Sequence, residues 1–362
     1  MAEANWHHLG DIEDLKTKPL QQMLIGGLPL ALSYRDGEFG AISGRCLHVG
    51  GPLGSGQLAD DGFVVCPWHS WQFHRLTGDA RPGIPAAVSR YELKEENGEL
   101  YVNLTPATQP RHAPHPVHPL TREHKREPGP PRVVGISTTI MNRTFPRYST
   151  SEDLLHAALD QATSQGAESK LIRLNDLAFA NCEGYYSKSA RACTWPCSIT
   201  QRDPQDELTE VYESLVFWAD VVLVATSIRW GAPSSLYFKM VERMNCVQNE
   251  ITTHGRVLIR NKVAGFVITG GQDNIQAVAG QMMMFFGELG FVFPQFPFVA
   301  HSRGWSAEDM ESNIVQVKGS QELRDGTRAL AERCLEIAGT LIGSDEATTT
   351  IERGGRKACG DE

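Results

Sequence analysis

The sequence predicts two domains of different fold class: a small all-β domain first, then a larger α/β domain built as a doubly wound, five-stranded parallel sheet. Three observations predict this division. Residues 1–104 contain short apolar runs separated by Gly, Pro and Asp turns. Residues 105–131 are rich in Pro, His, Arg and Glu and have almost no apolar periodicity. From residue 132 onwards, apolar runs alternate with amphipathic stretches, which is the order that builds a parallel sheet covered by helices.

The composition fits a soluble globular protein. A chain of 362 residues is long for one core and suits two. The formal net charge of -9 argues against a nucleic-acid or anionic-membrane partner. No apolar run is long enough to span a bilayer, and the start MAEANWHH lacks the features of a signal peptide. We therefore expect a cytoplasmic protein whose eight cysteines do not form a disulfide framework.

The first domain, residues 1–104, should be an all-β module. A strong turn signal, Asn97-Gly98, predicts a hairpin between its last two strands. The six predicted strands are 23–25, 30–34, 40–42, 63–65, 91–93 and 100–104.

Two short stretches of this domain contain a set of metal ligands. The first stretch supplies Cys46 and His48, and the second supplies Cys66 and His69. Two thiolates and two imidazoles can hold a 2Fe-2S cluster, with both Cys on one iron and both His on the other. A zinc site uses the same ligand types, but its usual order is Cys-Cys followed by His-His. The arrangement favours iron and sulfide over zinc.

The flanking residues strengthen this interpretation. Gly50-Gly51-Pro52-Leu53 follows the first pair, and Thr77-Gly78 lies beyond the second. With these flanks the stretch resembles a Rieske domain, from which it departs mainly by having Ser70 where Gly is usual. In respiratory Rieske proteins each loop carries a further Cys, and Gly51 and Trp68 stand there in this chain. The resemblance is therefore to the ferredoxin and oxygenase branch, which implies a comparatively low potential and a cytoplasmic setting.

Residues 105–131 should form a linker. Its extended, Pro-rich composition predicts a semi-stiff spacer that lets the cluster domain dock on its own partner domain or on that of a neighbouring subunit. Ligation of a metal by its histidines is not expected, because spacing on such a chain seldom converges; they are His112, His115, His118 and His124.

The second domain, residues 132–343, should alternate strands and helices. The predicted strands are 133–136, 171–174, 221–225, 263–268 and the Phe-rich segment 291–299. The predicted helices are 151–164, 206–219, 234–247, 273–289 and 320–342. Residues 344–362 look like a disordered tail.

In a doubly wound sheet the ligand lies beyond the carboxyl ends of the strands. Three loops that follow strands carry hydroxyl, Gly, Arg and aromatic residues suited to a phosphate and a ring. The candidate cofactor-binding residues are Ser137, Arg143, Ser149, Thr150 and Ser151 after the first strand, Thr226, Ser227, Arg229, Trp230, Gly231 and Ser234 after the third, and Thr269, Gly270 and Gly271 after the fourth.

Together these loops resemble the flavodoxin-like family of NAD(P)H-dependent FMN reductases and iron-sulfur flavoproteins. Trp230, Gly231 and Ser234 match the family's second loop, whereas Ser227 and Arg229 replace the usual Pro and Tyr. The resemblance implies a flavodoxin-like fold, bound FMN and a homodimer or homotetramer. The alternative is a flavin-free scaffold whose Ser and Thr residues only cap helices.

The remaining cysteines give a weaker signal. Cys182, Cys193 and Cys197 occupy the stretch where iron-sulfur flavoproteins place four Cys for a 4Fe-4S cluster. Only three are present, so a second cluster is not expected. No pattern links Cys246, Cys334 and Cys359, and the run Met282–Met284 is interpreted as helix core.

These features predict an electron-transfer flavoprotein oxidoreductase. Electrons would pass between NAD(P)H, FMN and the 2Fe-2S cluster, in either direction, with an oxygenase, a quinone or a small molecule as acceptor. No Gly-x-Gly-x-x-Gly motif follows a strand, so no separate nicotinamide domain of the Rossmann type is expected. The choice between NADH and NADPH stays open, and no catalytic residue is assigned.

Two other functions share some of these features. A terminal Rieske oxygenase is rejected, because the Asp153 to His156 stretch has no second His nearby for a mononuclear iron. A non-enzymatic carrier or redox sensor with a flavin-free scaffold remains the alternative.

Overall fold

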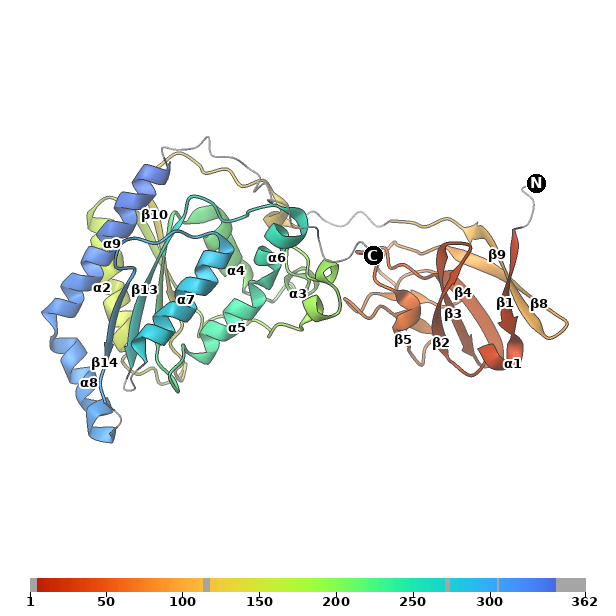
Figure 1. Ribbon diagram of the computed structural model, residues 1–362, viewed down its shortest axis with the longest axis horizontal. Helices are drawn as coiled ribbons and strands as arrows, with labels where there is room; N and C mark the ends of the chain where they lie inside the picture. Colours follow the sequence, from red (N-terminus) through yellow and green to blue (C-terminus); the bar gives the residue numbers. More distant parts are fainter. Residues whose placement is uncertain (1–4, 113–117, 271–273, 305, 343–362) are drawn as a thin grey trace. The chain divides into compact units, whose positions relative to one another are not determined.

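The computed structural model describes residues 5–112, 118–270, 274–304 and 306–342. The chain forms two compact units (Figure 1). The first comprises Met1–Val117 together with the segment Gly184–Ala192, and the second comprises His118–Glu183 and Cys193–Glu362. The predicted tail at 344–362, Gly271 and His115 lie outside the described residues.

The first unit is all-β, as predicted. A six-stranded antiparallel sheet has the order β1-β9-β8-β4-β3-β2, and a three-stranded sheet has the order β5-β6-β7. The strands are β1 (Trp6–Asp11), β2 (Leu20–Ile25), β3 (Leu28–Arg35), β4 (Glu38–Ser43), β5 (Gln57–Leu58), β6 (Phe63–Val65), β7 (Gln72–His74), β8 (Arg90–Glu96) and β9 (Glu99–Thr108). A short helix, α1 (Ile12–Leu15), follows β1.

The turn between β8 and β9 lies where the Asn97-Gly98 signal predicts it. Both residues have positive φ, 55° at Asn97 and 84° at Gly98. Two consecutive left-handed residues define the tight turn that matches the twist of an antiparallel hairpin. The hairpin extends further than its sequence pattern indicates, because β9 continues to Thr108.

The second unit is a doubly wound parallel sheet of five strands, which confirms the predicted flavodoxin-like class. Its order is β11-β10-β12-β13-β14, and every neighbouring pair is parallel. The strands are β10 (Arg132–Ser137), β11 (Glu168–Arg173), β12 (Val221–Ser227), β13 (Val263–Gly270) and β14 (Phe298–Ser302). Only the end of the Phe-rich segment 291–299 is strand.

Alternate residues of the central strands pack into two hydrophobic layers, one on each face of the sheet. Val221 and Leu223 pack with α2 (Thr150–Ser164) and α9 (Gln321–Ile342) on one face of the sheet. Val222 and Val224 pack on the other face, in the layer formed with α5, α6 and α7 (Figure 1). These helices span Ser235–Arg243, Asn245–His254 and Ile275–Leu289. The sheet is buried on both sides, so only its edges and strand ends can reach a ligand.

Two predicted helices differ in detail. Stretch 206–219 begins as α4 (Thr209–Tyr212) and continues as a π-helical turn, Glu213–Trp218. The helix predicted at 234–247 is divided at Met244 into α5 and α6. Helices α3 (Ser198–Arg202) and α8 (Ala307–Gly319) were not predicted, and α8 contributes to the site described below.

Part of the predicted linker packs into the second unit. Leu120 is fully buried, and its carbonyl oxygen accepts a hydrogen bond from Trp195 Nε1 at 3.1 Å. Arg126 pairs with the buried Asp220. Among the residues that the structure describes, no helix combines the length and the apolar composition needed to cross a bilayer.

Candidate functional site

The two ligand-bearing loops of the first unit have the same backbone hydrogen-bond pattern. The amide of Cys46 donates to Gly51 O at 2.8 Å, and the amide of Cys66 donates to Trp71 O at 2.7 Å. In the return direction, Gly50 N donates to Cys46 O at 2.9 Å and Ser70 N donates to Cys66 O at 3.1 Å. Each Cys therefore begins an equivalent tight turn.

This equivalence explains why Gly is usual at the position that Ser70 occupies in this chain. Gly50 and Ser70 occupy the same place in their turns, and both have positive φ, 82° and 59°. Gly adopts this conformation without a Cβ penalty, whereas Ser is strained in it. The loop tolerates the strain because the turn bonds around Ser70 hold its backbone.

The four predicted ligands come together. His48 Nδ1 and His69 Nδ1 lie 2.9 Å apart, and the thiols of Cys46 and Cys66 hydrogen bond to each other. That bond lowers the pKa of Cys66 to about 6 and, with burial, raises that of Cys46. Two Nδ1 atoms and two sulfurs that converge in pairs are the donor set of a 2Fe-2S cluster with one His pair and one Cys pair.

The absence of a side chain at Gly51 leaves space for the thiol of Cys66. A Cβ built at Gly51 would lie 2.7 Å from Cys66 Sγ and 3.2 Å from the Trp68 ring. The Trp71 ring stacks on His48, with an interplanar angle of 5°. Small and aromatic residues thus fix both loops around the ligand set.

The segment Gly184–Ala192 covers one of these ligands. His69 Nε2 lies 2.6 Å from the carbonyl oxygen of Ala192, and the Tyr185 ring lies edge-on to the imidazole, with centroids 4.9 Å apart. Lys188 Nζ donates to Pro67 O at 2.7 Å. His69 is 3% exposed as a result. The sequence pattern gave no sign that a segment beyond residue 132 belongs to the first unit.

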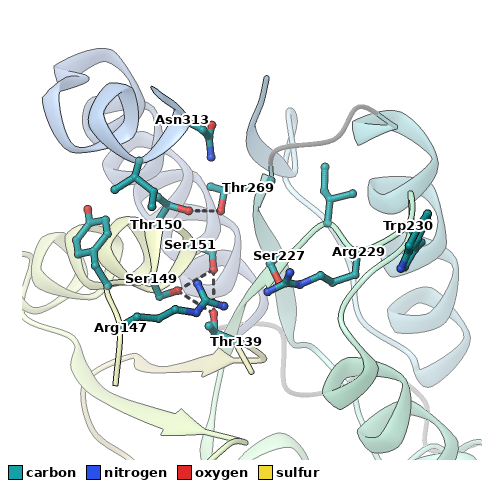
Figure 2. Close-up of a pocket in the computed structure, with 14 residues that line it drawn as sticks. Thr139, Arg147, Ser149, Thr150, Ser151, Ser227, Arg229, Trp230, Thr269 and Asn313 are labelled. Atoms are coloured by element: carbon teal, nitrogen blue, oxygen red, sulfur yellow. Dashed lines mark hydrogen bonds between the residues drawn. The ribbon is translucent and has the colours of Figure 1, made fainter. Parts of the chain in front are cut away.

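A cavity of about 320 Å³ in the second unit lies beyond the carboxyl ends of β10, β12 and β13 (Figure 2). Its lining residues are Thr139, Arg147, Tyr148, Ser149, Thr150, Ser151, Ser227, Ile228, Arg229, Trp230, Thr269, Gly270, Asn313 and Ile314. This is the edge at which a doubly wound sheet binds its ligand.

One wall of the cavity is a group of hydroxyls at the start of α2. Thr139 Oγ1 lies 2.8 Å from Ser149 Oγ and 3.2 Å from Ser151 Oγ. Ser149 is the N-cap of this helix of 15 residues, and Arg147 points its guanidinium toward the hydroxyls (Figure 2). Free amides at a helix start, hydroxyls and an Arg together suit a phosphate group.

The other walls contain polar atoms that lack a partner. Ser227 Oγ and Asn313 Oδ1 are buried and have no hydrogen-bond partner among the described residues. The whole Asn313 residue is only 5% exposed. An unpaired buried polar atom costs about 1–3 kcal/mol, so both atoms are suited to a ligand that bonds them. Trp230 is 93% exposed and offers a free aromatic face at the mouth.

The structure gathers eight of the predicted cofactor-binding residues at this cavity: Ser149, Thr150, Ser151, Ser227, Arg229, Trp230, Thr269 and Gly270. Arg143 lines a neighbouring cavity instead. Ser137 lies within the sheet, and Thr226 and Ser234 bond Thr138 in the core beneath. Gly231 does not line the cavity, and its Cβ position would lie 2.9 Å from Asn274.

Six lining residues were missed by sequence reasoning: Thr139, Arg147, Tyr148, Ile228, Asn313 and Ile314. Thr139 and Arg147 lie inside the loop after the first strand and could have been included with Arg143 and Ser149. Asn313 and Ile314 are on α8, which lies outside the three loops that the sequence indicated as ligand-binding.

The two sites define a redox protein that combines an iron-sulfur centre with a flavin-binding α/β domain. The chain belongs to the Rieske 2Fe-2S domain family over residues 5–95. Residues 132–306 match the model of the NADPH-dependent FMN reductase family. These families imply a 2Fe-2S cluster, FMN and NAD(P)H. The converging Cys and His side chains of the first unit suit the cluster, and the cavity of the second unit suits FMN.

Individual relatives match one domain or the other. A human Rieske domain-containing protein is 30% identical over 115 residues, which are 27% of this chain and 73% of that protein. The 8-demethyl-8-aminoriboflavin-5'-phosphate synthase of Streptomyces davaonensis is 23% identical over 171 residues, covering 44% of this chain and 61% of the enzyme. Among solved structures, RosB with its bound intermediate, 8-demethyl-8-formylriboflavin-5'-phosphate, is similar at 16% identity and a TM-score of 0.46, over 64% of this chain and 92% of RosB.

Proposed function

We propose that the protein is an NAD(P)H-dependent flavoprotein oxidoreductase in which electrons pass between NAD(P)H, FMN, the 2Fe-2S cluster and an acceptor. When bound, FMN supplies hydride acceptance and one-electron release, and the cluster supplies one-electron transfer. The coupling of a two-electron centre to a one-electron centre in one chain is the chemical reason for the fusion.

The observation that carries the proposal is the contact between His69 and Ala192. Ala192 ends a segment that the chain places between two stretches of the second unit, Glu183 and Cys193 being its covalent neighbours. The hydrogen bond from the imidazole to the Ala192 carbonyl therefore connects a cluster ligand, through one peptide bond, to Cys193. The chain thus passes from the second unit to a cluster ligand and back, which supports joint work of the two centres in one protein.

The chain's own residues have separable tasks in the flavin site. Thr139, Ser149 and Ser151, with Arg147, would bind the FMN phosphate at the start of α2. Ser227 and Asn313 would bond the polar groups of the cofactor, which satisfies their unpaired atoms. Trp230 would stack on the ring and exclude water from one face.

The electron acceptor, the oligomeric state and the cellular compartment are parts of the same proposal. We propose an oxygenase, a quinone or another small molecule as the acceptor, in either direction of flow, and a homodimer or homotetramer in the cytoplasm.

The test is anaerobic spectroscopy of the purified, reconstituted protein. Cofactor release followed by chromatography identifies the flavin, and titration with NADPH and separately with NADH follows flavin and cluster absorption. The proposal expects released FMN, a Rieske spectrum and bleaching of both bands by one of the two donors. A cluster spectrum without any flavin would favour the carrier or sensor instead, and flavin and cluster that neither nucleotide bleaches would exclude the nicotinamide-linked function.

A further inference from the structure

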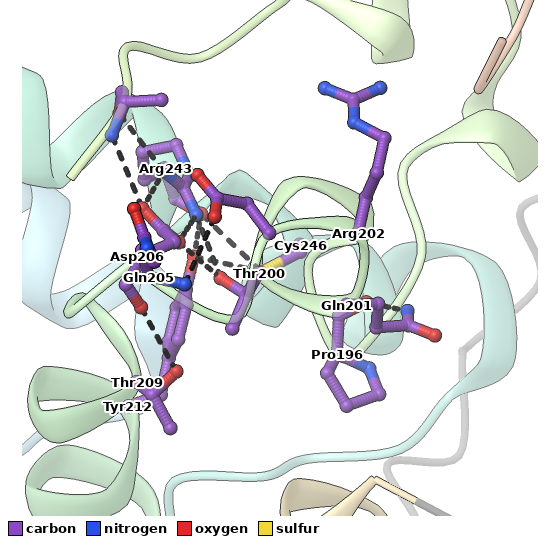
Figure 3. Close-up of polar contacts among 12 residues, drawn as sticks. Pro196, Thr200, Gln201, Arg202, Gln205, Asp206, Thr209, Tyr212, Arg243 and Cys246 are labelled. Carbon is purple, nitrogen blue, oxygen red and sulfur yellow. Dashed lines mark hydrogen bonds and ion pairs between the residues drawn. The ribbon is translucent and has the colours of Figure 1, made fainter. Parts of the chain in front are cut away.

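A buried ion pair in the second unit holds both ends of one excursion of the chain, residues 181–199. Arg243 and Asp206 form the pair, and both side chains are 0% exposed (Figure 3). At the entry to the excursion, Arg243 Nη1 donates to Ala180 O at 2.9 Å, and the amide of Ala180 donates to Asp206 Oδ1 at 3.2 Å. At its exit, Thr200 Oγ1 donates to Asp206 Oδ2 at 2.6 Å and accepts from Arg243 Nη2 at 2.8 Å. The excursion therefore leaves the second unit and returns to it at one fixed point.

The excursion contains Gly184–Ala192, the segment that belongs to the first unit. The last residue of this segment, Ala192, contacts the cluster ligand His69 through its carbonyl oxygen, and Lys188 donates to Pro67 O. Both contacts join residues that are far apart in the sequence. They therefore depend on where the chain is held on either side of the segment, and the buried ion pair holds it on both sides.

Two further contacts at the ends of the excursion are exposed or act on one end. Glu183 pairs with Arg202 and so joins entry and exit, but both side chains are 41% exposed, and solvent screens such a pair. Asn249 Nδ2 donates to Cys193 O at 2.7 Å, which holds the exit but not the entry. The buried ion pair differs from both contacts, because it fixes entry and exit together and is closed to solvent.

The pair keeps its charges although it is buried. Burial raises the pKa of Asp206, but the bonds from Arg243 and Thr200 outweigh this effect and lower that pKa below its usual value. Each oxygen of the ionised carboxylate accepts two hydrogen bonds. A buried ion pair adds little stability over apolar side chains of the same shape, because the cost of desolvation offsets the attraction. What this pair supplies is a set of directional bonds that fix two distant stretches of chain.

We propose that Arg243 and Asp206 are positioning residues of the iron-sulfur centre. By fixing both ends of the excursion, they keep the carbonyl oxygen of Ala192 against His69 Nε2 and so maintain the orientation of a cluster ligand. Without the pair the excursion opens more often, and His69 then loses this partner while the two ligand loops keep their own turn bonds. The inference concerns the cluster and requires neither the flavin nor a nicotinamide.

The experiment is limited trypsin digestion of the folded, cluster-loaded, full-length protein, with the products followed over time by mass spectrometry. Lys188 and Arg191 are cleavage sites inside the excursion, and Arg256 is a reference site elsewhere in the second unit. The variant combines Arg243→Met with Asp206→Leu, so that neither charge is left buried alone. Cleavage after Lys188 and Arg191 should become roughly five times faster or more, the effect of about one lost hydrogen bond, while cleavage after Arg256 stays unchanged.

A second readout is the electron paramagnetic resonance spectrum of the cluster after reduction with dithionite. Loss of the partner of His69 should alter the g-values, whereas a purely structural role of the ion pair would leave them unchanged. The matched control combines Arg126→Met with Asp220→Leu, because this ion pair of the second unit bonds the start of β10 instead. The control should change neither the spectrum nor the cleavage rates inside the excursion.

A smaller change decides the question if the double variant does not fold. Thr200→Val keeps the shape of the side chain but removes the hydroxyl that joins the exit to the ion pair. Its control is Thr327→Val, at a fully buried site on α9. Thr200→Val should speed both cleavages in the excursion roughly two- to fivefold over that control. Equal rates in these two variants, or a folded double variant with the parent's rates and spectrum, would overturn the proposal. An equal rise after Arg256 would also overturn it, since the whole second unit would then be loosened.

Discussion

His69 Nε2 and the carbonyl oxygen of Ala192 are 2.6 Å apart, although 123 positions separate the two residues in the chain. A carbonyl oxygen can only accept, so His69 carries its hydrogen on Nε2. The tautomer is thereby fixed and the Nδ1 lone pair is left to face Nδ1 of His48, as a metal ligand requires. A segment outside the cluster loops therefore sets the orientation of a ligand.

The positive charge of Lys188 should raise the reduction potential of the cluster. Lys188 is bonded to Pro67 O, next to the ligands, and its charge stabilises the extra electron of the reduced state. Lys188→Ala should lower the potential by on the order of tens of millivolts, read by redox titration of the Rieske signal. Lys188→Arg keeps the charge and should change the potential little. Lys16→Ala should also change the potential little, because Lys16 pairs with the exposed Glu13. An unchanged potential in Lys188→Ala would show that the charge is screened.

Ser70→Gly should stabilise the first unit. Ser70 is exposed and has a φ of 59°, so the variant loses little contact and relieves backbone strain of roughly 1 kcal/mol. The reverse change at the equivalent turn, Gly50→Ala, should destabilise it by a similar amount, since a Cβ there meets no neighbour and only the positive φ opposes it. Thermal unfolding of the cluster-loaded protein measures both. Equal melting temperatures for the two variants would contradict the equivalence of the turns.

Trp230→Ala should weaken FMN binding without unfolding the domain. The side chain is 93% exposed and contributes little to the core, whereas ring stacking contributes about 0.5–1.5 kcal/mol, or roughly a 2- to 13-fold rise in Kd. Met284→Ala is the control, because Met284 is 68% exposed and lies on α7, away from the cavity lining. Fluorescence titration of the apoprotein with FMN gives both constants. If the two variants bind FMN equally well, Trp230 does not contact the ring.

The buried Lys262 should make stability depend on pH. Burial lowers its pKa to about 7, from about 10.5 when unfolded, and its Nζ bonds Ala219 O. Between about pH 7 and 10.5 the unfolded chain therefore binds more protons than the folded one, and the free energy of unfolding should rise with pH through this window.

Lys262→Met should remove that rise. Below pH 7 the variant should be more stable than the parent by roughly 1–4 kcal/mol, after allowance for the unpaired carbonyl of Ala219. Lys125→Met, at an exposed site, should keep the parent's slope. Denaturant unfolding at a series of pH values supplies the comparison, and a parent and Lys262→Met variant with the same dependence of stability on pH between 7 and 10 would contradict the assignment.

Much of both folds follows from local pattern. The apolar runs predict the three central strands of the parallel sheet, β10, β12 and β13, because buried strands are nearly continuous hydrophobic stretches. The two edge strands are less buried, and the predicted segment 291–299 overlaps β14 only at its end. The four candidate cluster ligands can be predicted because each of two short loops contributes a Cys and a His, and the structure brings the two histidines together. In contrast, β1 was missed: its sequence, WHHLGD, is polar and its residues are only partly buried.

What the sequence did not disclose depends on tertiary placement. No periodicity marks the transfer of Gly184–Ala192 to the first unit, since its contacts with His69 are long-range. Asn313 enters the cavity of the second unit from α8, a helix distant in sequence from the other lining segments. Pairings of this kind are set by packing, which the identities of single residues do not encode.

The most direct test of the proposed function asks whether NADPH reaches the cluster only through the flavin. Flavin-depleted, cluster-loaded protein and the same protein with FMN restored are mixed anaerobically with NADPH, and the reduced Rieske signal is followed by electron paramagnetic resonance. We expect no signal without FMN and full signal with FMN, while dithionite reduces the cluster in both. A signal of equal size and rate without FMN, or none with FMN bound, would contradict it.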